Sequence, residues 1–173
     1  MSTIEIKRAT EQDSEILAHL GSTTYIESHG HFIEDKDDLN RYLISSFSQE
    51  KVKQELRNQQ NLFYLIFTND LPVGYAKVVL NSTHESVSWQ NACRLERIYI
   101  LEKHIPLKLG KPFLTFIEKQ AKDLKFDALW LSVYIKNQRA IRFYQKNDFL
   151  DVGRLNFMVN GKGYENLVLS KEL

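Results

Sequence analysis

Cysteine is almost absent from this chain of 173 residues, because Cys93 is the single one. One thiol cannot close an internal disulfide or build a cysteine metal cluster, so nothing in the sequence requires an oxidising compartment. No apolar run approaches the ~20 residues that span a bilayer, and the first ten residues lack the apolar core of a secretion signal. We therefore expect a cytoplasmic protein.

An excess of charge of either sign is also missing, because 23 Lys and Arg residues balance 22 Asp and Glu residues. Such a balance gives no general attraction to nucleic acid or to an anionic membrane, so we expect neither as a partner. The 3 prolines and 7 glycines are scattered and form no linker. Together with an ordinary apolar fraction of 43%, this predicts a single domain over residues 1–173.

Hydrophobic periodicity predicts strands that alternate with helices. A helix should follow Thr10, a plausible N-cap, while residues 22–35 suggest a loop or irregular helix. The segment TNDLP and the Asn160-Gly161 step favour tight hairpin turns. Strands are expected near 4–9, 62–67, 73–80, 94–101, 128–134, 149–159 and 164–169, with two helices over 36–58 and others near 112–124 and 137–147. This order predicts an α/β (α+β) fold, with a mixed central β-sheet and helices on both faces.

Three segments carry patterns of chemical interest: LERIYI at 95–100, IPLKLGK at 105–111 and NQRAIRFYQKNDF at 137–149. In order and content they resemble the GNAT superfamily of N-acetyltransferases, and LPVGYAKV and TTYIESHGHF make bacterial spermidine/spermine N-acetyltransferases the most similar group. The resemblance implies the GNAT fold, acetyl-CoA as cosubstrate, and direct acetyl transfer to a primary amine such as a polyamine.

The resemblance also implies which residues hold acetyl-CoA. The fourth strand would bond the pantetheine arm, and the following loop would bind pyrophosphate at a helix N-terminus, where unpaired amides and a positive dipole end gather. That family loop usually reads Gln or Arg, two residues, Gly, one residue, then Gly or Ala, so Ile105 and Lys108 depart from it and Gly110 fits. An ordinary connection with solvated lysines would explain the loop alone. The implied cofactor-binding residues are Ile98, Tyr99, Ile100, Pro106, Leu107, Lys108, Leu109, Gly110, Lys111, Asn137 and Tyr144.

Two residues are candidates for catalysis by the same resemblance. Tyr144 would protonate the departing thiolate, since a phenol of pKa ~10 can supply a proton to a thiolate whose acid has pKa ~8.5. An amine of pKa ~10.4 is neutral in only about one molecule in a thousand at pH 7, so Glu96 would act as general base, through water. Each has an alternative: Tyr144 as a core aromatic, and Glu96 in a salt bridge to Arg94 or Arg97. Asn137 suits a helix N-cap equally well.

The acceptor pocket is expected near residues 23–35. There Glu27 would attract a cation by long-range electrostatics, and Tyr25 and Phe32 would pack on its methylenes. The alternative is a solvated acidic surface. His29 and His31 have no third ligand at a recognisable spacing, so no metal is expected.

Other functions remain open at this point. The acceptor could be a protein N-terminus or lysine, or the altered loop could mark a CoA-binding sensor that has lost the chemistry. Relatives often form dimers, so a homodimer is possible.

Overall fold

The computed structural model describes residues 3–173. They form a seven-stranded sheet in the order β1-β2-β3-β4-β5-β7-β6, together with helices, which confirms the predicted mixed sheet. The chain divides into two compact units, and each is treated by itself below. Of the described residues, unit 1 comprises 3–78 and Arg97–Thr115, and unit 2 comprises Val79–Glu96 and Phe116–Leu173.

Unit 1 begins with β1 (Ile4–Arg8), which pairs antiparallel with β2 (Asn61–Thr68). The next strand, β3 (Leu71–Val79), follows a tight turn in which Asn69 and Asp70 have φ of 48° and 64°. Two successive left-handed residues suit the twist of a hairpin, and Asn and Asp tolerate that conformation. The hairpin predicted from TNDLP is therefore confirmed.

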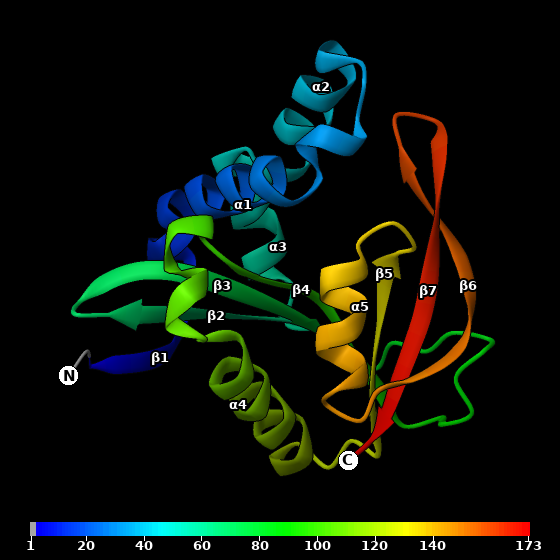
Figure 1. Cartoon of the computed structure of the whole chain (residues 1–173). Coiled ribbons are helices and arrows are strands. Elements are labelled where there is room, and N and C mark those ends of the chain that lie inside the picture. Colours follow the sequence, from blue (N-terminus) through cyan, green and yellow to red (C-terminus); the bar gives the residue numbers. More distant parts are fainter. Residues whose placement is uncertain (1–2) are drawn as a thin grey trace. The chain divides into compact units, whose positions relative to one another are not determined.

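Three helices precede that hairpin in the sequence: α1 (Ser14–His29), α2 (Lys36–Phe47) and α3 (Gln49–Arg57) (Figure 1). The two helices predicted over 36–58 are confirmed. Asp35 and Ser48 begin them, because the Asp35 carboxylate accepts from Asp37 N at 2.8 Å and Ser48 Oγ accepts from Lys51 N at 3.3 Å. These are N-caps of the usual kind.

The loop or irregular helix expected over residues 22–35 is for the most part regular helix, since α1 continues to His29 and a 3₁₀ turn, Gly30–Phe32, follows. The Ser and Thr hydroxyls in this stretch donate hydrogen bonds to backbone carbonyls one turn earlier, so these residues do not interrupt the helix. The bonds run from Ser22 Oγ to Ala18 O at 2.9 Å, from Thr24 Oγ1 to Leu20 O at 2.7 Å, and from Ser28 Oγ to Thr24 O at 2.7 Å.

The start of α1 also differs from the prediction. Thr10 precedes a 3₁₀ turn, Glu11–Asp13, and the Thr10 N–H donates to Asp13 Oδ2 at 2.8 Å. The helix itself begins at Ser14. Thr10 therefore caps the short turn that leads into α1.

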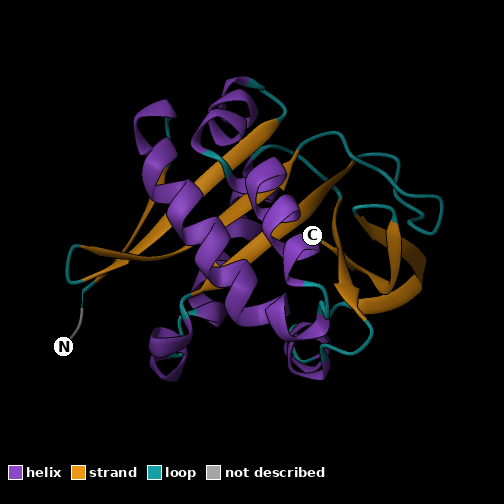
Figure 2. Cartoon of the chain, turned by 90° about the horizontal axis from the view of Figure 1, so that it is seen from above, coloured by secondary structure: helices purple, strands orange, loops and turns teal. Residues whose placement is uncertain are grey.

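The core of unit 1 lies between these helices and the sheet. Leu17 and Leu20 of α1 and Val52 of α3 cluster with Phe63 and Tyr75 from the strands. Helices are purple and strands orange in Figure 2, where the teal loops mostly make short connections.

Unit 2 contains β5 (Ala128–Tyr134), β6 (Leu150–Val159), β7 (Lys162–Glu172) and α5 (Gln138–Gln145). Both β4 (Ala92–Ile100) and α4 (Gly110–Asp123) continue from one unit into the other. The first four residues of β5 are all buried, as the almost wholly apolar segment predicted. Asn160 and Gly161, with φ of 49° and 84°, confirm the tight turn between β6 and β7.

The polar loop predicted at 81–90 is confirmed between β3 and β4. It is anchored to β5, because Trp130 Nε1 donates to Ser82 O at 2.8 Å. Within the described part of the chain, no helix is long and apolar enough to cross a bilayer.

Candidate functional site

The loop between β4 and α4 lies in unit 1. It forms a 3₁₀ turn, Glu102–Leu107, and then Lys108 adopts a left-handed conformation with φ of 56°. Leu109 O accepts from Phe113 N at 3.1 Å, which is the first α-helical bond of α4. The predicted pyrophosphate residues Pro106–Lys111 thus lie where a turn becomes a helix N-terminus.

This geometry fits a phosphate-bearing ligand. A helix N-terminus presents amides with no partner inside the helix, and its dipole favours negative charge. Lys108 stands where the family usually has a glycine. Its left-handed backbone conformation is the one that glycine adopts most readily. Its side chain is exposed, and that of Leu109 is buried. The departure at Lys108 therefore keeps the backbone conformation of a glycine, and the binding of CoA by this loop remains a prediction.

Glu27 of α1 contacts the same loop. Its Oε2 accepts from the backbone N–H of Glu102 at 2.9 Å. The carboxylate therefore stabilises the start of the 3₁₀ turn after β4, which is a contact that the sequence did not predict. The proposed attraction of Glu27 for a cationic acceptor remains a prediction.

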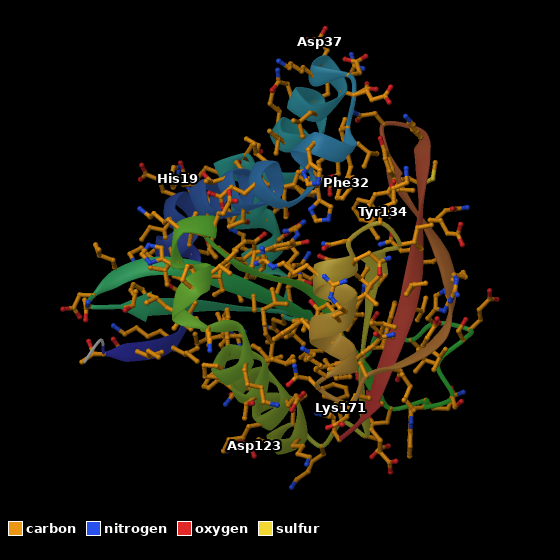
Figure 3. The ribbon with its side chains drawn as sticks, in the orientation of Figure 1. His19, Phe32, Asp37, Asp123, Tyr134 and Lys171 are labelled. Carbon is orange, nitrogen blue, oxygen red and sulfur yellow. The ribbon has the colours of Figure 1, made fainter. Side chains whose placement is uncertain are left out.

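The other two predicted acceptor residues lie near the end of α1. Tyr25 is only 6% exposed and packs on Tyr42 and Phe47, with ring centroids 4.7 and 5.8 Å away. Phe32 is half-buried, and its ring lies 3.9 Å from that of His31. Figure 3 labels Phe32 close to α1 and Asp37 at the outer end of α2.

A buried ionic cluster in unit 1 was not predicted. Glu55 of α3 accepts from Lys77 Nζ of β3 at 3.2 Å and from Arg97 Nη1 of β4 at 3.3 Å. All three side chains are largely buried. The Arg97 guanidinium also lies over the ring of Phe47, 4.7 Å from its centroid. Arg97, considered as a partner for Glu96, thus forms an ion pair with Glu55.

The end of β4 contains Ile98, Tyr99 and Ile100, all half-buried. Gly74 of β3 lies directly against this stretch, because a methyl group there would overlap Tyr99 O and lie 2.6 Å from Ile100 Cδ1. Glycine therefore permits close approach of the two backbones.

Unit 2 contains Asn137 and Tyr144 on α5. Asn137 Oδ1 accepts from Ala140 N at 3.2 Å, which confirms its N-cap role. Tyr144 is half-buried, and its ring contacts Phe143 and Phe149 edge-on at 5.3 and 5.6 Å. Glu96, in the part of β4 that belongs to unit 2, is half-buried too. The catalytic roles of Tyr144 and Glu96 remain predictions.

The pairing of β5 differs on its two sides. Its antiparallel register with β7 runs along the whole strand, from Ala128 to Tyr134. Its parallel register with β4 covers only Ala92 to Arg94, opposite Ala128 to Trp130, in the part of the chain that the structure describes. Both strands continue beyond this short register.

Cys93 lies in this register, opposite Leu129, and is fully buried. Burial raises the pKa of its thiol to about 12, so the thiolate is scarce at neutral pH. This agrees with the expected core role. Among residues 3–173, no three His, Cys, Asp or Glu side chains are grouped to hold a metal ion.

Comparison with known proteins identifies the family. The model of the acetyltransferase (GNAT) family matches residues 18–149. An N-acetyltransferase from the pepI 3′ region of Lactobacillus delbrueckii subsp. lactis is 21% identical over 100% of this chain and 99% of its own.

Solved structures share the fold. PaiA N-acetyltransferase from Thermoplasma acidophilum, in complex with coenzyme A, has a TM-score of 0.76 at 21% identity and 99% coverage of both chains. Mutant forms of the spermidine/spermine N-acetyltransferase SpeG from Vibrio cholerae have a TM-score of 0.68 at 14% identity, with 98% and 95% coverage. The chain therefore belongs to the GNAT family and is an acetyl-CoA-dependent N-acetyltransferase.

Proposed function

We propose that the enzyme acetylates a primary amine of a small cationic acceptor, with a polyamine such as spermidine as the first candidate. In this proposal the backbone of Ile98–Ile100, the loop from Pro106 to Lys111 and the Asn137 side chain bind acetyl-CoA. Tyr144 and Glu96 handle the protons.

The observation that carries the proposal is the short register of β4 with β5. Among the residues that the structure describes, three residues of β5 pair with β4, whereas the entire strand pairs with β7. One edge of β5 pairs with β7 along the whole strand. On the other edge, the residues of β5 after Trp130 pair with no residue of β4 in the described chain. Backbone groups at such an edge can bond an extended ligand in place of a strand, which suits a pantetheine arm.

Acidic side chains support a cationic acceptor. Between residues 27 and 38 the chain carries five carboxylates, Glu27, Glu34, Asp35, Asp37 and Asp38, against Lys36 as the one Lys or Arg. Asp35 caps α2 and Asp38 pairs with Arg41, while Glu34 is exposed. Such a surface raises the local concentration of a polycation. The printed name of the Vibrio cholerae neighbour, an acetyltransferase of spermidine and spermine, points to the same substrate class.

The residue types suit the chemistry. Acetyl-CoA supplies the acetyl group as a thioester. The amine nitrogen forms a bond to the acetyl carbon, the carbon–sulfur bond breaks, and the sulfur receives a proton from the Tyr144 hydroxyl. Before the attack, Glu96 takes one proton from the ammonium group through water and releases it to solvent. The nitrogen loses its second proton to water after the attack, and a proton from solvent restores the Tyr144 phenol. General acid and base groups of this kind each contribute ~10²–10⁴-fold to a rate.

The test is a thiol-release assay with acetyl-CoA against spermidine, spermine, a monoamine, amino acids and short peptides. We expect turnover of the polyamines, and a KM for spermidine that rises with salt more steeply than that of the monoamine, because salt screens the acidic surface. Turnover of peptides alone would replace the polyamine with a protein acceptor. Calorimetric binding of acetyl-CoA without turnover of any amine would favour a sensor.

A further inference from the structure

A cluster of four aromatic rings in unit 1, Tyr25, His29, Tyr75 and Tyr99, joins α1 to β4 and β3. Tyr25 stacks on His29 with centroids 4.9 Å apart and planes 14° apart. His29 meets Tyr99 edge-on at 6.0 Å, and Tyr99 lies 6.1 Å from Tyr75. The proposed function assigns the Tyr99 backbone to acetyl-CoA, so this ring cluster adjoins the region that an acceptor nitrogen must reach.

Hydrogen bonding determines which nitrogen of His29 carries the proton. Ser28 Oγ donates its single proton to Thr24 O at 2.7 Å. The same oxygen lies 2.6 Å from His29 Nδ1, and while its proton is on Thr24 O it accepts from that nitrogen. From this arrangement we infer the tautomer in which Nδ1 carries the proton of the neutral ring and Nε2 presents a lone pair. No residue between 3 and 173 donates to that nitrogen.

The imidazole is also neutral over the working range of pH. Burial, and then the charge of nearby His31, lower the pKa of His29 to about 4. In the described part of the chain, the titratable side chains whose rings contact that of His29 are Tyr25 and Tyr99. A ring with this pKa is too weak a base to keep a proton from an amine of pKa ~10.4. It can still accept a hydrogen bond.

Tyr75 supplies a second polar group that lacks a partner. Its side chain is 1% exposed, and its hydroxyl makes no hydrogen bond within the described chain. Burial raises the pKa of the phenol, so the hydroxyl keeps its proton and can donate a hydrogen bond at neutral pH. Buried hydroxyls nearly always have hydrogen-bond partners, so this hydroxyl is a polar group that can bond a substrate.

We propose that His29 is an acceptor-binding residue, whose Nε2 accepts a hydrogen bond from the nitrogen that becomes acetylated, with the Tyr75 hydroxyl as a second polar contact for the same substrate. The inference rests on the proposed function. His29 orients the amine, so that its lone pair is directed at the acetyl carbon, while proton removal stays with Glu96. No sequence pattern indicated this role, because the spacing of His29 and His31 was considered only for metal binding.

Two substitutions separate this role from a purely structural one. His29→Asn places an amide that can still donate to Ser28 Oγ but leaves no acceptor at the position of Nε2. His29→Gln places an amide oxygen near Nε2 and gives up the bond to Ser28. His19→Asn, an exposed histidine on the same helix, serves as the matched control (Figure 3).

We expect His29→Asn to lower kcat/KM for spermidine by about 10-fold, the effect of one lost hydrogen bond, and His29→Gln to remain within about 3-fold of the unsubstituted enzyme. Calorimetric binding of acetyl-CoA should change by less than about 2-fold in both variants. The deficit of His29→Asn should be constant between pH 6 and 9, because a group with a pKa of about 4 does not titrate there. Nitrogen-15 NMR of the free protein should show the Nδ1–H tautomer.

Other outcomes overturn the inference. If His29→Asn is as active as the unsubstituted enzyme, or more active than His29→Gln, the ring has only a structural role through its hydrogen bond with Ser28 and does not bind the substrate. An Nε2–H tautomer in the NMR spectrum, which needs no substrate and no activity, would also reject it. If the unsubstituted enzyme binds acetyl-CoA but acetylates none of the amines, the proposed function itself fails, and the spectrum still tests the tautomer.

Discussion

Asn137 has two assigned roles that substitution can separate. As the N-cap of α5 it bonds Ala140 N through Oδ1 at 3.2 Å, and as a proposed cosubstrate contact it would donate through its amide. Asn137→Ala removes both, whereas Asn137→Ser keeps an oxygen for the cap and loses the amide. Loss of a cap costs about 1 kcal/mol, which for a chain of this length lowers Tm by about 2–4 °C. Serine is about as good an N-cap as asparagine, so Asn137→Ser should have a Tm close to that of the unsubstituted enzyme.

Binding of acetyl-CoA should respond differently. A lost hydrogen bond of about 0.5–1.5 kcal/mol weakens binding by about 2- to 12-fold, and both variants of Asn137 should show it. Urea unfolding gives the stability and titration calorimetry gives the affinity. Equal destabilisation by serine and alanine would refute the cap argument. Unchanged affinity in the serine variant would leave Asn137 as a cap alone.

Three further substitutions test the other assigned residues. Tyr144→Phe should lower the rate constant for acetyl transfer by about 10²-fold or more without changing the Kd for acetyl-CoA, and an unaltered single-turnover rate would remove Tyr144 from its role. Glu96→Gln should lower kcat by about 10²-fold for spermidine but much less for aniline, which is already unprotonated at neutral pH; equal losses would assign proton removal elsewhere. Gly74→Ala should destabilise the protein by about 1–3 kcal/mol and weaken acetyl-CoA binding, because its methyl group overlaps Tyr99 O. Gly163→Ala, whose nearest contact would be 3.5 Å away, is the control, and equal unfolding midpoints for the two variants would contradict the steric argument.

Local patterns predicted much of the fold. The apolar run at 128–134 and the Asn160-Gly161 step have structural meanings that depend on few neighbours, and both predictions agree with β5 and the β6–β7 turn. The end of α1 was harder to predict. Ser, Thr and Gly after Leu20 resemble a loop in composition, and only the bonds from their hydroxyls to carbonyls one turn earlier keep the helix intact.

The residues of the candidate site also fall into two groups, those set by local sequence and those set by contacts between distant residues. Asn137 and the loop to Gly110 could be placed from sequence, because a cap and a helix N-terminus are local features. The Glu27 contact with Glu102 joins residues 75 positions apart, and the bond of Arg97 to Glu55 joins residues 42 positions apart. Pairings at such distances depend on tertiary packing, which a pattern along one chain does not encode.

The fully buried thiol of Cys93 can be used to measure local opening of the structure around it. Because burial raises its pKa to about 12, a maleimide or aromatic disulfide should not react with the folded chain at neutral pH. Any labelling must follow an opening that separates the strands around Cys93 and Leu129. The labelling rate, measured with and without acetyl-CoA, would then report how strongly the cosubstrate restrains that opening, with no engineered probe.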